Sequence, residues 1–478
     1  MNQTNHKIVR LSFRDPDGFV CNYKDNFYRV IFQSYALDFE QLQQKQLVNH
    51  PLLVPHVAIH ADLYSEIIAA LVILYDPGFI TKIFTILAIK EIPFITYPWE
   101  WTPTQLKEAA LCTLSLQRQL IPLRLTLKDA TFYNIQFIGG KPYFIDLLSI
   151  KTAEKAYPWH PYGQFLRKFV NPLLLIKYKL FTNLKFLAAF PDGFNQNQIA
   201  SLLPIKSRFN LFCLLNVFLL KRLSDGKNEG KINLAAFEDV KVGQNKALQL
   251  IDYVGDFIRD IRTQSDTKVS VWNNYYNEDV SNPYHLNKYA AITEIMENIG
   301  PINRAIDLGA NTGEYSKLLC KYADAVLSIE FDDTCCDEIL KTIQIEQINN
   351  WQVANVDLVN PTGGVGWMSR ERLTIMSRMK GDLVCALAII HHFFFTNRKG
   401  FQDIVDLFIV IASDHLIVEF VDLNDEKVML INNFEGVVNY SKEEFINLMN
   451  GSFKLLNSIE VSETRTLLLF KRTIAAID

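Results

Sequence analysis

The sequence predicts an α/β protein in which a mixed region and a helical region precede a mainly parallel sheet. The chain has 478 residues, a length typical of two or three domains. Its composition is 49% hydrophobic and 12% aromatic, which is enough to form real cores. From about residue 265 onward, short apolar runs alternate with amphipathic helical patterns, as in sheets built from βαβ units.

The first 150 residues have α+β character. Short β-like runs at 28–32, 93–97, 135–137 and 142–145 are mixed with helical patterns, of which 104–120 is the longest. From about 160 to 262 the strand signals fade and helices rich in Phe and Leu dominate. Residues 151–262 hold 17 Lys and Arg against 9 Asp and Glu. A solvated helical face accounts for this excess, and an anionic partner is the alternative.

The last third contains the βαβ pattern. We expect strands at 304–308, 325–329, 351–356, 382–388, 415–420 and 465–470, with helices between them. We therefore divide the chain into domains at 1–262 and 263–478.

The net charge and the cysteines indicate which partners and which cellular compartment to expect. The net charge is −4, so no global field draws the chain to nucleic acid or to anionic lipid. Its 7 cysteines form no CxxC pair and no even framework, which favours free thiols in a reducing, cytoplasmic compartment. We expect neither a signal peptide nor a membrane span nor a metal site, and oligomeric state stays open.

A glycine turn follows the strand predicted at 304–308. Asp307 stands at the strand end, Gly309 and Gly313 frame the turn, and Ala310 and Asn311 lie inside it. Gly309 permits close approach of a ligand, and the helix after Gly313 offers free N–H groups to a carboxylate. An acid beside those donors suits a ligand with both an amine and a carboxylate, such as the methionine part of S-adenosylmethionine.

Further acids mark the next strand ends. Glu330 ends the second strand, where a carboxylate accepts ribose hydroxyls in dinucleotide folds. Phe331 would then lie against adenine, and Asp357 would accept from its exocyclic amine. Asp382, in the fourth strand, is the last of the residues that we expect to bind the cofactor.

The elements DLGANTG, E-F-D and D-L-V-x-A-x-A-I-I-H-H resemble class I S-adenosylmethionine-dependent methyltransferases, over roughly 268–473. This resemblance implies a Rossmann-like fold. The segments at 92–101, 127–137 and 361–367 are similar to long bacterial methyltransferases related to the nodulation protein NoeA, a similarity that spans most of the chain.

Candidate catalytic residues follow the fourth strand. His391 or His392 could deprotonate an acceptor hydroxyl or acidic C–H, or one of them could pack or cap a helix. Glu419 could bind substrate or make a structural hydrogen bond. Trp272, Tyr275, Tyr276 and Tyr284 precede the first strand and would cover the donor or pack as a linker.

A weaker constellation lies in the first domain. Asn134 follows Asp129 by five residues and Asp146 follows by twelve more, a pattern that resembles the catalytic loop and metal-binding Asp of kinase-fold phosphotransferases. Three features depart from the kinase pattern. Leu127 stands where kinases have His, no GxGxxG precedes it, and no V-A-I-K strand supplies the phosphate-binding lysine. Lys24 or Lys82, paired with Glu40, could substitute. We expect a degenerate kinase-like α+β domain with a helical lobe that serves acceptor recognition or regulation.

Three functions therefore compete. The first is methyl transfer to a small-molecule, sugar or carrier-bound acceptor, at oxygen or carbon, because the fourth strand lacks the N/D-P-P-Y/F motif typical of methylation at nitrogen of bases or amides. We therefore do not expect nucleic acid to be the substrate. The second adds phosphoryl transfer, and the third is a cofactor-binding pseudoenzyme.

Overall fold

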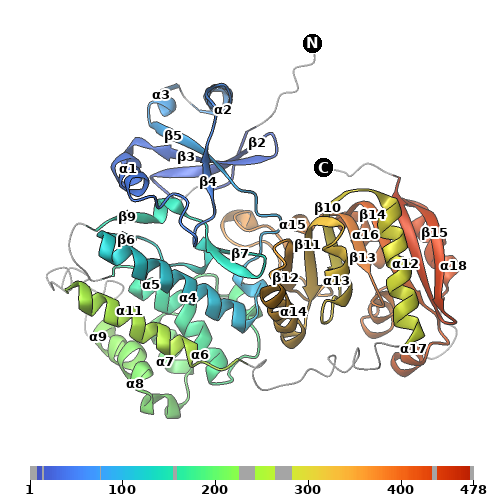
Figure 1. Cartoon of the computed structure of the whole chain (residues 1–478). Helices are drawn as coiled ribbons and strands as arrows, with labels where there is room; N and C mark the ends of the chain where they lie inside the picture. Colours follow the sequence, from blue (N-terminus) through green and yellow to red (C-terminus); the bar gives the residue numbers. More distant parts are fainter. Residues whose placement is uncertain are drawn as a thin grey trace. The chain divides into compact units, whose positions relative to one another are not determined.

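The computed structural model describes residues 8–12, 15–75, 77–153, 159–225, 243–263, 282–432 and 439–473. They fall into two compact units (Figure 1). Unit 1 comprises Met1–Ile92, Pro103–Gln136 and Pro142–Thr263, and unit 2 comprises Pro93–Thr102, Phe137–Lys141 and Gln264–Asp478. The last of these divisions lies beside the domain limit expected from the sequence. The assignment of 93–102 and 137–141 to unit 2 was not expected.

Unit 1 begins with a five-stranded antiparallel sheet. Its strand order is β1 (Val9–Arg10), β2 (Gly18–Tyr23), β3 (Asn26–Phe32), β5 (Ile83–Ile89) and β4 (His56–Ala58). Helices α1 (Ala36–Gln44), α2 (Ala61–Leu74) and α3 (Pro77–Ile80) accompany it. The strand predicted at 93–97 is wrong: that segment is irregular, and β5 is the strand. Pro93 and Pro98 lack the N–H groups that a sheet ladder needs.

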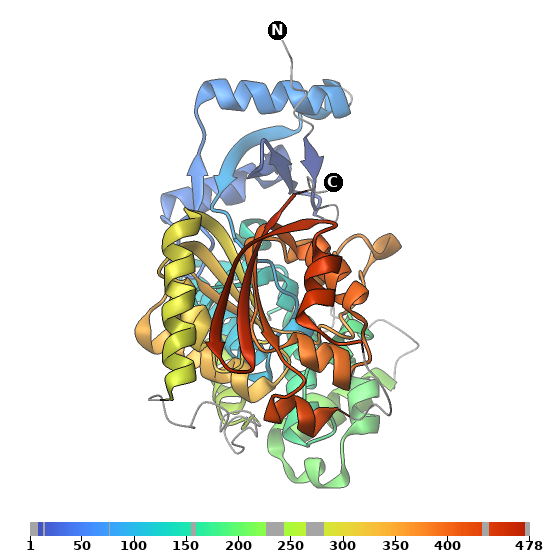
Figure 2. The ribbon, with the colours of Figure 1, turned by 90° about the vertical axis from the view of Figure 1, so that its right-hand side faces the viewer.

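The rest of unit 1 is mainly helical. Helix α4 (Pro103–Leu120) precedes two small sheets, in which β6 (Leu125–Leu127) pairs with β9 (Ile150–Thr152) and β7 (Ile135–Ile138) with β8 (Lys141–Phe144). The remaining helices are α5 (Tyr162–Phe165), α6 (Asn171–Lys177), α7 (Gln196–Leu202), α8 (Leu211–Cys213), α9 (Leu220–Asp225) and α11 (Gln244–Arg259). Figures 1 and 2 place α7, α8 and α9 at the end of unit 1 opposite the five-stranded sheet.

Unit 2 contains a seven-stranded sheet. The order is β12 (Trp351–Asn355), β11 (Ala323–Glu330), β10 (Ile302–Leu308), β13 (Gly381–Ala386), β14 (Ala412–Val421), β16 (Arg465–Arg472) and β15 (Phe453–Ser462). Strands β10 to β14 are parallel, and β16 is antiparallel to both neighbours. Every strand expected in this part of the chain is present. Strand β15, which was not expected, is an edge strand with a mostly exposed middle, so its hydrophobic signal is weak.

Helices cover both faces of this sheet. One core joins the sheet to α12 (Pro283–Ile299), α13 (Glu314–Leu319) and α14 (Asp333–Glu346), and the other joins it to α15 (Ile375–Arg378), α16 (Phe401–Ile411) and α18 (Lys442–Met449). Neighbouring strand residues alternate between the cores: Ala305 belongs to the first and Ile306 to the second. Short α17 (Glu426–Ile431) follows β14. Among the described residues, no helix combines the length and the apolar character that crossing a membrane requires.

The segment 93–102 is built into unit 2 by buried contacts. Phe94 belongs to the second core, and Gln352 of β12 donates from Nε2 to the Phe94 carbonyl at 3.2 Å and to the Phe137 carbonyl. The buried carboxylate of Glu100 forms an ion pair with Arg378 of α15. Burial raises the pKa of Glu100, and the Arg378 charge opposes this rise.

Candidate active site

The turn after β10 needs its glycines for two different reasons. Gly309 has φ +68°, and a Cβ there would lie 2.8 Å from the Ile389 side chain. Gly313 has φ +85°, and a Cβ there would lie 2.6 Å from the Trp351 ring, so glycine lets α13 approach β12. Glycine at 309 thus leaves room for the Ile389 side chain beside the turn, whereas glycine at 313 lets the helix pack closely against Trp351.

A cavity of about 330 Å³ opens at the carboxyl ends of β10, β11, β12 and β13. Six residues expected at a cofactor or catalytic site line it: Gly309, Asn311, Glu330, Phe331, Asp357 and His392. The other lining residues are mostly apolar: Ile329, Val356, Leu358, Val359, Leu387, Ala388, Ile389, Phe393, Thr396 and Asn397. The sequence analysis did not single out these apolar residues. An apolar pocket with a few convergent polar groups is typical of a small-molecule site.

Glu330 is held at the cavity wall by backbone donors. Its Oε1 accepts from the N–H groups of Phe331 at 2.7 Å and Asp332 at 3.0 Å, and its Oε2 accepts from Asn311 at 2.9 Å. Burial raises the pKa of Glu330, and these hydrogen bonds act against that rise. The carboxylate is therefore fixed between the glycine turn and the end of β11.

Asp307 ends a buried chain of hydrogen bonds. Trp351 Nε1 donates to Ser328 Oγ at 2.7 Å, Ser328 donates to Ser316 Oγ at 2.7 Å, and Ser316 donates to Asp307 Oδ2 at 2.5 Å. Because an indole N–H can only donate, it sets the direction of the whole chain toward the carboxylate. Burial raises the pKa of Asp307 to about 6, while the Ser316 hydrogen bond and the nearby Lys288 charge lower it.

The other expected cofactor residues are placed differently. Ala310 is buried in the first core of unit 2. Asp357 accepts from the backbone N–H of Val359 at 2.9 Å, which closes the turn after β12. Asp382 does not belong to the site. It lies at the amino end of β13, where its Oδ2 accepts from the backbone of Asn303 and Arg304, because a strand has two ends and only its carboxyl end faces the cavity.

The two histidines after β13 occupy different environments. His392 lines the cavity, and burial lowers its pKa. His391 is fully buried, and neither ring nitrogen has a hydrogen-bond partner. Burial, followed by the His392 and Arg465 charges, holds the pKa of His391 well below its usual range, so the ring is neutral at neutral pH.

Glu419, at the carboxyl end of β14, lies in a buried charge network. It accepts from Lys288 Nζ at 2.6 Å and from the Tyr284 hydroxyl at 2.5 Å, both on α12. Arg465 donates to the same hydroxyl at 2.8 Å and pairs with Asp425 at 2.8 Å. Glu419 thus makes structural hydrogen bonds, the alternative weighed for it. The sequence did not reveal Lys288, Asp425 and Arg465, because their partners lie far away along the chain.

The other aromatic residues expected over the donor, Trp272, Tyr275 and Tyr276, lie outside the described residues.

The polar and aromatic residues that line the cavity fit the adenosine part of S-adenosylmethionine. Glu330 presents a carboxylate at the position where related folds bind ribose hydroxyls, and Phe331 presents a ring that is half exposed. The N–H groups of Gly309, Ala310 and Gly313 bond to backbone carbonyls, and that of Asn311 bonds to Glu330. Asp307 is buried behind the turn and is not among the cavity-lining residues.

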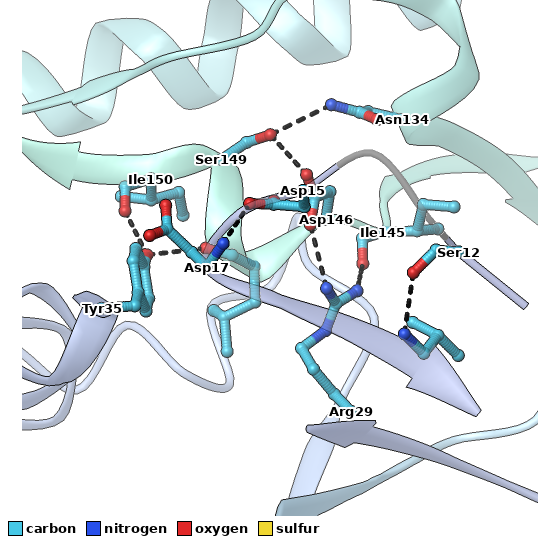
Figure 3. Close-up of polar contacts among 12 residues, drawn as sticks. Ser12, Asp15, Asp17, Arg29, Tyr35, Asn134, Ile145, Asp146, Ser149 and Ile150 are labelled. Atoms are coloured by element: carbon cyan, nitrogen blue, oxygen red, sulfur yellow. Dashed lines mark hydrogen bonds and ion pairs between the residues drawn. The ribbon is translucent and has the colours of Figure 1, made fainter. Parts of the chain in front are cut away.

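In unit 1, two of the three kinase-like positions come together (Figure 3). Asn134 Nδ2 donates to Ser149 Oγ at 3.2 Å, and Ser149 donates to Asp146 Oδ2 at 2.6 Å. Asp129 accepts from Gln164 Nε2 at 3.3 Å. Within the described ranges, no cluster of three His, Cys, Asp or Glu side chains is arranged to hold a metal ion.

The cation beside Asp146 is Arg29 of β3, which the sequence analysis missed. Its Nη1 lies 3.0 Å from Asp146 Oδ1, and its Nη2 donates to the Ile145 carbonyl at 2.8 Å (Figure 3). Its Nε donates to His56 Nε2 at 3.1 Å. Burial, helped by the Arg29 charge, lowers the pKa of His56 to about 3. The signal that could have found Arg29 is a lone cation in an apolar strand.

The lysines proposed for that role are elsewhere. Lys24 pairs with Glu66 on the surface, and both Lys82 and Glu40 are exposed. Lys128, next to Asp129, pairs with Asp15 at 3.1 Å and Asp17 at 2.7 Å.

Comparison with known proteins gives one relative by sequence and several by structure. No protein-family model matches the chain. Nodulation protein NoeA of Rhizobium meliloti (strain 1021) is 28% identical over 470 residues, covering 97% of this chain and 95% of that protein. The N-methyltransferase NodS of Bradyrhizobium japonicum WM9, in complex with S-adenosyl-L-homocysteine, aligns with 40% of this chain and 89% of its own, at 11% identity and a TM-score of 0.31.

Magnesium protoporphyrin IX methyltransferase of Synechocystis PCC 6803 aligns with 44% of this chain and 86% of its own, at 13% identity and a TM-score of 0.30. The strand order of unit 2 and its glycine turn agree with the fold expected from the sequence. The chain is thus similar to NoeA along nearly its whole length, and unit 2 has the strand order and the glycine turn of the fold expected from its sequence.

Proposed function

We propose that the protein transfers the methyl group of S-adenosylmethionine to oxygen or carbon of a small-molecule, sugar or carrier-bound acceptor. The observation that carries this proposal is the cavity, where Glu330, Phe331 and Asp357 meet the glycine turn at one edge of the sheet. When bound, the cofactor supplies an electrophilic methyl group on a sulfonium. The residues of the chain then orient the two reactants and exclude water, which accounts for much of the rate of such displacements.

Each cofactor contact in this proposal has a named residue. Glu330, fixed by three backbone donors, accepts the ribose hydroxyls with the lone pairs that remain. Phe331 lies against adenine, and Asp357 accepts from its amine. Asp307, fixed through Ser316, holds the ammonium group.

The proton of the acceptor needs a base. His392 lines the cavity and is the candidate that a bound acceptor can reach. His391 is the second candidate, because its ring is fully buried and burial holds its pKa well below the usual range. The chain lacks the proline-containing motif typical of methylation at nitrogen of bases and amides, which supports an oxygen or carbon acceptor.

For unit 1 we propose a degenerate kinase-like fold that recognises the acceptor or regulates the enzyme. The five-stranded sheet, the long α4 and the loop around Asn134 support the likeness. Phosphoryl transfer is the weaker alternative, because the Arg29 guanidinium already occupies one oxygen of Asp146 and Ser149 the other. A metal ion at Asp146 would have to displace both contacts.

The test is calorimetric titration of the full chain with S-adenosylhomocysteine. We expect a Kd on the micromolar scale, about −8 kcal/mol. The Glu330→Ala variant loses a charged acceptor for two hydroxyls, at about 1.5 kcal/mol or more each, so its affinity falls at least about 100-fold. The control is Glu346→Ala, which removes a surface partner of Lys317.

Tritium transfer from labelled S-adenosylmethionine into extract fractions then reports the acceptor. The proposal fails if the wild type binds neither cofactor form, or binds NAD instead.

A further inference from the structure

The helical end of unit 1 carries an apolar surface on a helix that is apolar on both sides. The pieces Leu211–Cys213, Leu214–Leu219 and Leu220–Asp225 follow one another without a break. Their inner side is buried through Phe212, Cys213, Asn216 and Val217. Their outer side also carries large apolar residues at helical spacing: Leu211, Leu214, Leu215 and Leu219, all exposed.

The preceding turn extends this surface. Ile205 and Phe209, in the short helix Ile205–Phe209, are 76% and 89% exposed, and Leu211 is 62% exposed. We call these three residues with Leu214, Leu215 and Leu219 the 205–219 surface. An ordinary soluble surface exposes such side chains singly, so their concentration in fifteen consecutive residues marks an interaction site.

Positively charged residues predominate along the chain on both sides of the 205–219 surface. Residues 172–224 contain 7 Lys and Arg and only 1 Asp or Glu, in a chain whose net charge is −4. Lys206 Nζ lies 5.9 Å from the Tyr178 ring centre, and the Arg208 guanidinium lies 5.3 Å from the Phe218 ring centre. These cations thus stand beside apolar groups, as Lys and Arg do at the boundary between hydrocarbon and water.

We propose that the 205–219 surface docks on the face of a membrane that contains anionic lipid. Apolar side chains flanked by Lys and Arg, with almost no acid, are the composition of elements that lie in a lipid interface. A protein interface favours Tyr, Trp, Phe, Met and Arg and is poor in Lys, whereas four of the six residues of this surface are Leu. The elements that carry this surface lie at the end of unit 1 opposite the five-stranded sheet (Figures 1 and 2).

The experiment is flotation of the full chain with vesicles. We expect binding to vesicles of phosphatidylcholine mixed with phosphatidylglycerol, weak binding to phosphatidylcholine alone, and weaker binding at higher salt. The double variant Ile205→Gln/Phe209→Gln removes two apolar contacts and lowers the partition coefficient about 100-fold. Lys206→Gln/Arg208→Gln lowers it about 30-fold, because each charge near the surface contributes about a factor of five.

The matched control is Ile73→Gln on α2, a residue that is 84% exposed and lies outside the 205–219 surface. It should bind vesicles like the wild type, and all variants should keep the wild-type melting temperature. The proposal is overturned if the wild type does not float with the mixed vesicles, or if both double variants float like it. It is also overturned if the only effect of Ile205→Gln/Phe209→Gln is to abolish self-association, which would make the surface an interface between two copies of this chain.

Discussion

The hydrogen-bond chain behind Asp307 predicts how cofactor affinity changes with pH. Burial raises the pKa of Asp307 to about 6, so the carboxyl is mostly ionised at neutral pH and mostly protonated about two pH units lower. Only the ionised form attracts the ammonium group of the ligand. We therefore expect the affinity for S-adenosylhomocysteine to fall roughly tenfold between about pH 7 and about pH 5.

Ser316→Ala is the perturbation that tests this reasoning. It removes the donor at 2.5 Å from Asp307 Oδ2, a bond that stabilises the charged form by about 1.5–3 kcal/mol. The pKa of Asp307 then rises by about one to two pH units, and affinity near pH 7 falls about two- to tenfold. Raising the pH to about 8.5 should restore it. A merely structural serine would not shift a pH profile in this way.

The assay is calorimetry at constant ionic strength from about pH 5 to about pH 8.5, with each variant compared with the wild type at the same pH so that titration of the ligand amine affects both equally. Lys288 and Glu330, the other charges that act on Asp307, are left intact in every variant. Asp307→Asn should bind weakly with a flat profile. Ser458→Ala, which changes an exposed serine on β15, should match the wild type. If Ser316→Ala keeps both the affinity and the pH midpoint of the wild type, Asp307 does not hold the amine.

Two further predictions concern the histidines and unit 1. His392→Asn should lower incorporation of labelled methyl about 100-fold while the affinity for S-adenosylhomocysteine stays unchanged, because His392 lines the cavity. The same substitution at the buried His391 shows which ring accepts the proton, and unchanged incorporation in His392→Asn would assign that ring to packing. ATP consumption with magnesium should be absent, and Asp146→Asn should lower the free energy of unfolding in urea by about 1.5–3 kcal/mol, because Arg29 loses its charged partner. Magnesium-dependent ATP consumption that Asp146→Asn abolishes would instead establish a second catalytic site.

The sequence predicted the strands of unit 2 well, because buried parallel strands are continuous apolar runs between helical patterns. Strand β15 escaped because half its side chains face solvent. The run at 93–97 was mistaken for a strand, since apolar character alone does not distinguish a ladder from an irregular segment that is buried by tertiary contacts.

The sequence predicted those site residues that stand at the carboxyl ends of consecutive strands. Glu330 and Asp357 sit at consecutive strand ends and line the cavity, whereas Asp382 stands at the wrong end of its strand. Adjacent residues such as His391 and His392 diverge in burial, which no one-dimensional pattern encodes. Arg29 escaped because the expected cation at that position was lysine, and a guanidinium can make the same ion pair.

The buried pair of Glu100 and Arg378 has a consequence for folding on the ribosome. The two residues are 278 positions apart, and at about 5–20 residues per second Glu100 waits roughly 15–60 seconds for its partner to be synthesised. During that time the segment 93–102 has no core to enter, because Phe94 packs among side chains that come mostly from the last third of the chain. While the chain is still being synthesised, an uncovered apolar strip therefore lies between the first two segments of unit 1, which is where a chaperone would bind.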